Sequence, residues 1–304
     1  MLPPAELQPM LIIGRGSNLL LTGDFPGAVL RSAVTGIEIV QQNGSDVLLR
    51  CGSGEEWDRV VEQALGMGLY GMENLSLIPG DVGASAVQNI GAYGAEVSHI
   101  IYSVEAVEIG TGRIAELSAA ECGYAYRQSR FKGEWKNRFL ITHVTYRLSR
   151  QFSPQLDYGN LRAVVDVQHD AGLSAWDVRN AVISIRRQKL PDPDVEGNAG
   201  SFFMNPVVER SQYDTLLRQY PDMPSYPASG NQVKLPAGWL IDRAGWKGCS
   251  MGSAAVHDRQ ALVLVNKGGA TGRDILRLCR AIQQDIRDKY GIDLQPEVNI
   301  VHSS

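Results

Sequence analysis

Two spacings of apolar residues run along the chain, and each predicts a different kind of element. Apolar residues that alternate with polar ones, or that form short runs beside glycine, predict strands. We expect strands at residues 10–14, 46–52, 103–109, 139–148, 261–267 and 294–301. In the last of these, Leu294, Val298 and Ile300 share one face. Glu297 therefore lies on the other, polar face.

Three segments carry apolar residues at helical spacing instead. We expect the first helix to open at Ser53, because Ser53 and Glu56 have the spacing of a capping box. Its apolar stripe consists of Trp57, Val60, Val61, Ala64 and Leu65, and Gly66 ends it. The second helix is expected at 175–189, where the two prolines of the segment 190–194 stop it.

The third helix is expected at 271–290 and ends at Gly291. Its inner face consists of Ile275, Leu278, Ile282 and Ile286. A chain of 304 residues is long for one core, and helices and strands are mixed throughout. We therefore predict two α+β units, with a boundary between the strand ending near Leu148 and the second helix.

Two glycine-rich segments suggest a phosphate-binding site. Gly14 and Gly16 directly follow the first strand, but Leu19 stands where a dinucleotide fingerprint needs a third glycine. An ordinary tight turn is the alternative there. The segment 74–96 holds four more glycines among small residues, so its backbone amides can approach an anion. A packing loop is the alternative for it, while two such loops in one domain favour a pyrophosphate ligand.

Composition and charge narrow the class of protein. Hydrophobic residues make up 44% and charged residues 20%, which is typical of globular domains. The net charge of -4 disfavours nucleic acid as a partner. The four cysteines are widely spaced, so we expect reduced thiols and no metal site. The sequence has no signal peptide and no membrane-spanning run, and we expect a cytoplasmic protein without a membrane partner.

Seven motifs occur in a characteristic order along almost the whole chain. They are GRGSNLL, ENLSLIPGDVGASAVQNIGAYG, YAYRQSRFK, KLPDP, GNAGSFFMNP, AGWLID and LQPEV. In this combination the chain resembles the family of UDP-N-acetylenolpyruvoylglucosamine reductases. The segment LDYGNL, at 156–161, is similar to the tyrosine loop of the first subtype of that family.

The resemblance implies an α+β fold with a vanillyl-alcohol-oxidase-type (PCMH-like) FAD-binding domain at residues 1–151. A smaller α+β substrate-binding domain would follow at 152–304. The first domain appears shortened, because family members usually carry a few tens of residues before the segment matching Met10. FAD would be held non-covalently, since neither glycine loop contains a histidine. NADPH would be the co-substrate, the UDP-sugar the small-molecule substrate, and the protein a monomer.

The implied reaction adds hydride to the enolpyruvyl ether of UDP-N-acetylglucosamine and yields UDP-N-acetylmuramate. The developing enediolate needs a cation or an acid at its carboxylate and a proton donor at the adjacent carbon. The motifs carry these roles to Arg127 and Glu297 at the carboxylate and to Ser201 as the donor at C2. Without the resemblance, each has an ordinary alternative: a surface arginine, a solvated glutamate and a small packing residue.

The motifs also assign binding residues. Those expected at FAD are Gly14, Gly16, Ser17, Asn18, Pro79, Gly80, Gly83, Ser85, Asn89, Gly91 and Gly94. Those expected at the UDP-sugar are Tyr158, Lys189, Asn205, Lys247 and Gln260. His257 is expected to be packed or hydrogen-bonded, with no catalytic role. Met204 stands where the family usually has a basic residue, which would weaken phosphate or cofactor affinity.

Two other functions remain open from the sequence. The first is a shortened, inactive relative that only binds flavin or nucleotide. The second is a flavin oxidoreductase of the same fold with another substrate.

Overall fold

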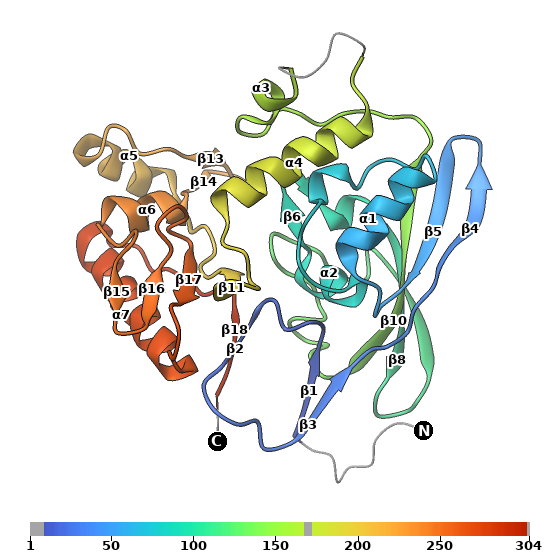
Figure 1. Cartoon of the computed structure of the whole chain (residues 1–304), viewed down its shortest axis with the longest axis horizontal. Coiled ribbons are helices and arrows are strands. Elements are labelled where there is room, and N and C mark those ends of the chain that lie inside the picture. The colour runs from blue at the N-terminus through green and yellow to red at the C-terminus, as the bar shows by residue number, and fades with distance from the viewer. Residues whose placement is uncertain (1–8, 167–171, 303–304) are drawn as a thin grey trace. The chain divides into compact units, whose positions relative to one another are not determined.

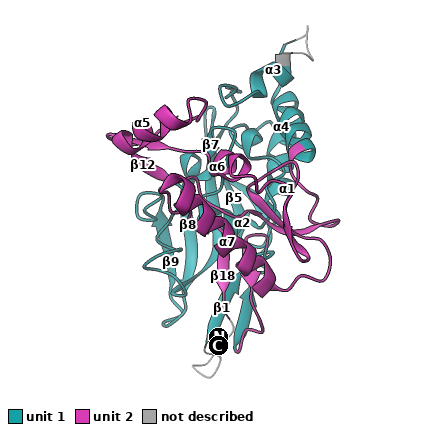
Figure 2. Cartoon of the chain, turned by 90° about the vertical axis from the view of Figure 1, so that its left-hand side faces the viewer, with its two compact units in different colours: residues 1–16, 27–188 teal, residues 17–26, 189–304 magenta. Residues whose placement is uncertain are grey.

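The computed structural model describes residues 9–166 and 172–302. The chain divides into two compact units, coloured separately in Figure 2. The first unit consists of residues 1–16 and 27–188, and the second consists of residues 17–26 and 189–304. A ten-residue segment from near the N-terminus therefore belongs to the unit that is otherwise C-terminal.

A five-stranded antiparallel sheet dominates the first unit (Figure 1). Its strands, in spatial order, are β4 (Ile37–Asn43), β5 (Asp46–Gly52), β10 (Phe139–Ser149), β8 (Ile101–Glu108) and β9 (Ile114–Ser118). Buried side chains of β5, β8 and β10 share one core with the helices α1 (Trp57–Gly66) and α2 (Val82–Gln88). These strands and the apolar stripe of α1 were predicted from periodicity and are confirmed.

The remaining elements of the first unit are short, apart from the helix α4. They are β1 (Met10–Ile13) paired in parallel with β3 (Ala28–Arg31), β6 (Gly91–Ala92) paired with β7 (Ala95–Glu96), the 3-10 turns η2 (Glu73–Leu75) and η3 (Val97–His99), and the helices α3 (Leu161–Asp166) and α4 (Ala175–Lys189). The bounds of α4 are those predicted.

The start of α1 differs from the prediction. The helix begins at Trp57 with Glu56 as its N-cap, and no side-chain hydrogen bond caps it. Ser53 is buried, its hydroxyl donates to the carbonyl oxygen of Ile141 at 2.7 Å, and it shares a second hydrogen bond with the hydroxyl of Ser32 at 2.6 Å. The capping box expected at Ser53 is therefore wrong, because β10 and the segment around Ser32 take its hydroxyl first.

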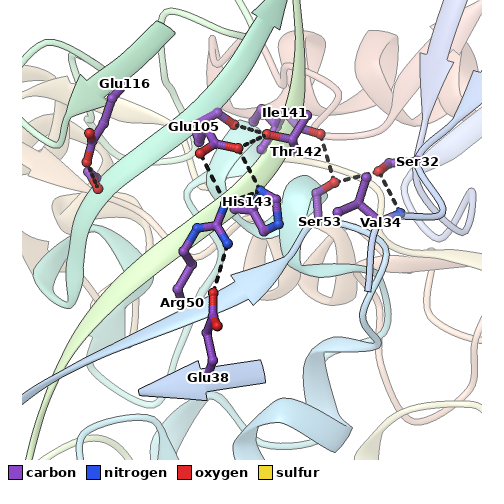
Figure 3. A network of polar contacts seen from close by, with 11 residues as sticks. Ser32, Val34, Glu38, Arg50, Ser53, Glu105, Glu116, Ile141, Thr142 and His143 are labelled. Carbon is purple, nitrogen blue, oxygen red and sulfur yellow. Dashed lines mark hydrogen bonds and ion pairs between the residues drawn. The ribbon is translucent and has the colours of Figure 1, made fainter. Parts of the chain in front are cut away.

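The opposite face of the sheet carries a polar network (Figure 3). A register shift in β10 sets both Thr142 and His143 beside Glu105 of β8. The hydroxyl of Thr142 donates to Glu105 at 2.7 Å, and Arg50 of β5 donates to the same carboxylate at 3.1 Å. Burial alone would raise the pKa of Glu105, but these hydrogen bonds lower it. The network joins the three central strands on their polar face.

Helix α4 joins the first unit through a buried ion pair. Both guanidinium Nη atoms of Arg179 donate to the carboxylate of Asp58 in α1, at 2.7 and 2.9 Å. The backbone amide of Leu77 donates to the same carboxylate, and Arg186 donates to the Leu77 carbonyl at 3.2 Å. The boundary expected after residue 151 therefore differs from the division between the units, which falls after Gln188.

The second unit contains two small antiparallel sheets and three helices. The first sheet has the order β11 (Gly197–Ser201), β17 (Val263–Asn266), β16 (Ala254–Val256) and β15 (Ser250–Met251). The second has the order β12 (Val207–Glu209), β14 (Gln232–Lys234) and β13 (Tyr226–Pro227). The helices are α5 (Arg210–Gln219), α6 (Ala237–Arg243) and α7 (Gly272–Tyr290).

Helix α7 follows its predicted pattern closely. Thr271 and Asp274 form a capping box, and Gly291 ends the helix at φ +62°. The predicted inner residues Ile275, Leu278, Ile282 and Ile286 are all buried in the main core of the second unit.

The C-terminal strand is shorter than predicted. Only β18 (Asn299–Val301) is a strand, and it pairs in parallel with β2 (Leu19–Leu21). The preceding residues turn toward β11, where Pro296 forms an isolated bridge with Phe203. The segment changes partner within a few residues, so it cannot remain one regular strand.

Candidate active site

The two glycine-rich segments pack against each other in the first unit. A Cβ built on Gly14 would lie 3.1 Å from the Cβ of Ala84, tighter than ordinary contact. Arg15 adds an ion pair, with 2.9 Å between its Nε and an oxygen of Asp81. Gly83 is confined as well, since a Cβ there would lie 2.9 Å from a neighbouring side chain. A side chain at position 14 would push the segments apart, and one at position 83 would clash with the residue that follows β5.

Other glycines in these segments are needed for their backbone conformation. The φ angles of Gly16, Gly80 and Gly94 are +76°, +134° and +81°. Gly80 is buried and follows the exposed Pro79. Gly16 is exposed, and a Cβ on it would meet nothing within 4 Å. The backbone at Gly16 is therefore accessible, so an anion can approach it closely.

Two polar side chains expected at the cofactor form hydrogen bonds inside the protein. Ser85 is buried, and its hydroxyl donates to the carbonyl of Val82 at 2.7 Å beside the hydroxyl of Tyr146. Asn89 is buried, and its amide donates to the carbonyl of Ala125 at 2.9 Å. These internal partners fix the shape of the loop, and the assignment of both residues to the cofactor stays a prediction.

Arg127 lies against the second glycine-rich segment in a strained conformation. Its φ of +55° is left-handed, which is costly for a residue with a side chain and typical of functional positions. Its Nη2 donates to the carbonyl of Gly91 at 2.6 Å, and Nη1 donates to that of Asn89 at 3.4 Å. Lys132 donates to the carbonyl of Arg127 at 3.2 Å. The guanidinium also lies 5.2 Å from the ring centroid of Tyr126.

Tyr158 is also placed beside this segment. A Cβ built on Gly94 would lie 3.4 Å from the Cβ of Tyr158, and the ring of Tyr93 stands edge-on at 6.3 Å. Tyr158 is 45% exposed. The first unit thus gathers the glycine segments, Arg127 and Tyr158.

Ser201 and Glu297 come together in the second unit. Ser201 ends β11, is half-buried, and its hydroxyl has no hydrogen-bond partner within residues 9–166 and 172–302. The amide of Glu297 donates to the carbonyl of Phe202, the next residue along, at 2.8 Å. The side-chain amide of Asn18 donates to the carbonyl of Glu297 at 3.4 Å. Asn18 and its neighbour Ser17, expected at FAD, therefore belong to the unit that holds Ser201.

The other four residues expected at the UDP-sugar belong to the second unit, where they lie in separate elements or loops. The carbonyl oxygen of the Asn205 side chain accepts the amide of Ala237 at 2.9 Å, at the start of α6. Lys247 is paired with Asp242 on an exposed surface. Lys189 is exposed at the end of α4.

Gln260 lies in a turn that His257 organises. The Nδ1 atom of His257 accepts the backbone amides of Arg259 and Gln260 at 3.3 and 3.2 Å. Burial lowers the pKa of His257, so the neutral form with an accepting nitrogen is favoured. The expectation that His257 is packed and hydrogen-bonded is confirmed.

Sequence reasoning missed two residues beside the candidate site. Lys132 supports the backbone of Arg127, and Tyr93 contacts Tyr158 with φ +48°. Both lie inside motifs quoted above, at the ends of YAYRQSRFK and NIGAYG. Their position in those motifs was the available signal.

The described residues contain neither a candidate membrane-spanning helix nor a candidate cluster of metal-binding side chains. No helix in the described ranges is both long and apolar enough to cross a membrane. No group of three or more histidine, cysteine or acidic side chains in those ranges could hold a metal ion.

Two family models match the chain. The model described as "UDP-N-acetylenolpyruvoylglucosamine reductase, C-terminal domain" matches residues 192–301. The model described as "FAD binding domain" matches residues 4–118.

Curated relatives match over nearly the full chain. The UDP-N-acetylenolpyruvoylglucosamine reductase of Bacteroides fragilis (strain YCH46) is 50% identical, over 96% of this chain and 87% of its own. The reductase of the same name from Burkholderia ambifaria (strain AMMD) is 50% identical, over 95% of this chain and 83% of its own. The crystal structure of the Thermus caldophilus reductase has a TM-score of 0.66 at 22% identity, covering 96% of this chain and 85% of its own.

These findings agree with the two-unit architecture. The structural match supports the fold, and the FAD-binding match gives the chain FAD as its cofactor. The expected α+β fold class, with a vanillyl-alcohol-oxidase-type FAD-binding domain and a smaller reductase domain, is confirmed. The chain belongs to the UDP-N-acetylenolpyruvoylglucosamine reductase family.

Proposed function

We propose that this chain reduces the enolpyruvyl group of UDP-N-acetyl-3-O-(1-carboxyvinyl)-glucosamine to give UDP-N-acetylmuramate, a precursor of peptidoglycan. NADPH is the reductant. Family membership supports the reaction class, and the two matched domains supply the cofactor and substrate halves. The observation that carries the proposal is the half-buried Ser201 hydroxyl, which has no hydrogen-bond partner in the described residues and precedes Phe202, whose carbonyl accepts the amide of Glu297.

Bound FAD supplies hydride, taken from NADPH, to the methylene carbon of the enolpyruvyl group. The protein then has to stabilise the negative charge that moves onto the substrate carboxylate. Arg127 binds this carboxylate, because a planar, permanently charged guanidinium matches two carboxylate oxygens. Its left-handed backbone and its bond to the carbonyl of Gly91 fix the guanidinium before substrate arrives.

Glu297 and Ser201 complete the chemistry. Glu297 is the second group at the same developing charge. Ser201 donates its proton to C2, which the hydroxyl can do only for a strongly basic carbon held in place. The adjacent Phe202 and Phe203 are buried, and they exclude water that would compete as a donor.

The UDP group is bound by Tyr158, Lys189, Asn205, Lys247 and Gln260. Lysines suit a diphosphate as mobile point charges. Lys247 has to leave Asp242 to serve this role, and the exposed position of the pair makes that exchange inexpensive. The enzyme works as a monomer in the cytoplasm. A molecular mass from light scattering tests the first point, and cell fractionation tests the second.

The reaction is tested by anaerobic stopped-flow spectroscopy of the flavin. Enzyme reduced by NADPH should be reoxidised rapidly by the enolpyruvyl UDP-sugar. Ser201→Ala should keep its FAD and its rate of reduction by NADPH, while product formation slows by about 10²–10⁴-fold, the usual contribution of a positioned proton donor. Ser250→Ala, at an exposed serine of the same unit, is the matched control and should react normally.

Two outcomes contradict the proposal. Product formation at the normal rate in Ser201→Ala removes that residue as the proton donor. A reduced enzyme that the enolpyruvyl sugar does not reoxidise removes the proposed substrate, and leaves an inactive relative or an oxidoreductase with another substrate.

A further inference from the structure

A cavity of about 680 Å³ lies within the second unit, at the start of α7. Its lining includes Thr22, Arg273, Leu276, Arg277, Arg280 and His302. The three arginines stand at positions i, i+4 and i+7 of α7, so they share one face of the helix.

The cavity has more positive charge than its own carboxylate can balance. Asp274 is its acidic residue, and it pairs with Arg277. The same carboxylate accepts the amide and hydroxyl of Thr271 in the capping box, at 2.8 and 2.7 Å. These hydrogen bonds hold the pKa of Asp274 at about 2, so it is fully ionised at neutral pH and already engaged.

Arg273 and Arg280 remain without a carboxylate partner among the described residues. Arg273 donates only to a neutral group, the carbonyl oxygen of Thr22, at 3.3 Å from Nε. Arg280 is exposed and forms no ion pair with any residue that the structure describes.

This contrasts with the other basic side chains of the second unit. Most of these side chains form an ion pair with a carboxylate. The pairs are Arg210–Asp214, Arg243–Asp222, Lys247–Asp242, Arg259–Asp258, Lys267–Glu196, Arg287–Asp293 and Lys289–Asp285. Two uncompensated guanidinium groups therefore face the same cavity in a unit where pairing is the rule.

The cavity is separate from the proposed catalytic residues of this unit. Strands β2 and β18 run parallel, with Leu19 beside Asn299 and Leu21 beside Val301. Asn18 and Glu297 lie before the first of these pairs, whereas Thr22 and His302 follow the last. Strands rise about 3.3 Å per residue, so the ladder separates the two ends by roughly 10 Å.

We propose that this cavity, which we call the α7 arginine pocket, binds a small anion bearing several phosphate groups. Guanidinium groups form paired hydrogen bonds with phosphate oxygens, and two uncompensated arginines match more than one phosphate. The volume accommodates a ligand larger than a single phosphate ion. The ligand binds in addition to the proposed substrate and independently of it.

Isothermal titration calorimetry of inorganic tripolyphosphate tests this proposal. The FAD-loaded protein is first saturated with UDP-N-acetylmuramate, so that phosphate sites of the proposed reaction are filled. The double variant Arg273→Gln/Arg280→Gln should bind tripolyphosphate at least about tenfold more weakly, because each lost charged hydrogen bond contributes on that scale. Glutamine keeps helix propensity, and both sites are exposed, so folding is preserved.

Arg218→Gln is the matched control. Arg218 lies on α5, is exposed, and also lacks an ion pair among the described residues, but it does not line the pocket. This variant removes the same charge and should bind tripolyphosphate like the parent protein. Titration with ATP separates two ligand classes: tighter binding than tripolyphosphate indicates a nucleotide, and equal binding indicates a polyphosphate.

Two results would overturn the proposal. One is the absence of tripolyphosphate binding once the UDP-sugar product is bound. The other is equal weakening in the double variant and in Arg218→Gln, which would mean that only overall charge matters.

Discussion

The side chain of Arg127 occupies the space where a side chain at position 91 would lie. A Cβ at position 91 would lie 2.8 Å from Nη1 of Arg127 and 2.9 Å from the carbonyl oxygen of Ala95. Both distances are too short for a real contact, so the side chain of Arg127 and the backbone at Ala95 would both have to shift. The position of the proposed carboxylate-binding group is thus set by the absence of a side chain on its neighbour.

We expect Gly91→Ala to slow reoxidation of the reduced enzyme by the enolpyruvyl sugar at least about tenfold, because a misplaced charge stabilises the transition state poorly. Stopped-flow absorbance of the flavin measures this rate. Gly66→Ala is the control, since a Cβ at the end of α1 meets nothing within 4 Å. An unchanged rate in Gly91→Ala would show that Arg127 does not need its present position.

The cysteines differ sharply in their environments. Burial raises the pKa of Cys51 and Cys279 to about 12 and that of Cys122 to about 11, whereas Cys249 is exposed. Thiolates are the reactive form. We therefore expect iodoacetamide at pH 8 to modify Cys249 alone in the native protein, as read by mass spectrometry. Cys249→Ser should abolish rapid labelling, and fast modification of a second cysteine would contradict the described burial.

At the scale of elements, α1 and α4 together hold the bend at Leu77, inside the second glycine-rich segment. Asp58 of α1 accepts the amide of Leu77, which has a strained φ of +57°, and Arg179 of α4 closes on the same carboxylate. Burial alone would raise the pKa of Asp58, but hydrogen bonds from Arg179 and Leu77 lower it. The ion pair therefore stabilises the fold in its charged form.

We expect Asp58→Asn to reduce the free energy of unfolding by roughly 3 kcal/mol at pH 7, because it leaves a buried arginine without its charge partner. The folded pKa of Asp58 is lowered, so its contribution is fully present above the unfolded value of about 3.9 and is lost as pH falls through the lower folded pKa. Urea titrations at pH 7 and at about pH 2 should therefore show a smaller effect of the variant at the acidic pH. Asp214→Asn, in an exposed pair, should cost at most about 0.5 kcal/mol.

The spacing of apolar residues predicted the helices well where only one face of the helix is buried. The stripes of α1 and α7 and the bounds of α4 follow from helical spacing that no tertiary contact overrides. It failed where a local signal competes with a distant partner. Ser53 has the sequence of a cap, but Ile141 lies 88 residues away and takes its hydroxyl. Such competition cannot be read from a local pattern.

The candidate site was predictable to a similar extent. Motifs carried the identities of Arg127, Ser201 and Glu297, and those roles stay predictions. Spacing could not reveal that Asn18 lies beside Glu297, because 279 residues separate them in the chain. It also could not reveal that Ser85 and Asn89 turn inward, since a small polar residue among glycines serves a ligand and a loop equally well.

At the scale of the whole molecule, we expect bound FAD to increase the free energy of unfolding. A ligand that binds only the folded protein stabilises it by about 2.7 kcal/mol at a free concentration of 100 times its Kd. We expect removal of FAD to lower the thermal midpoint measured by differential scanning calorimetry, and its return to restore it. NADPH alone should not replace it. Identical midpoints with and without FAD would contradict the cofactor assignment.

The pairing of β2 with β18 has a consequence for synthesis on the ribosome. The segment 17–26 is translated long before its partner strand, because Asn18 and Asn299, which hydrogen-bond across this ladder, are 281 positions apart. A nascent chain must therefore carry an unpartnered apolar strand, Leu19–Leu21, until β18 has been translated. A chain cut off before β18 keeps an exposed edge that chaperones or proteases can recognise.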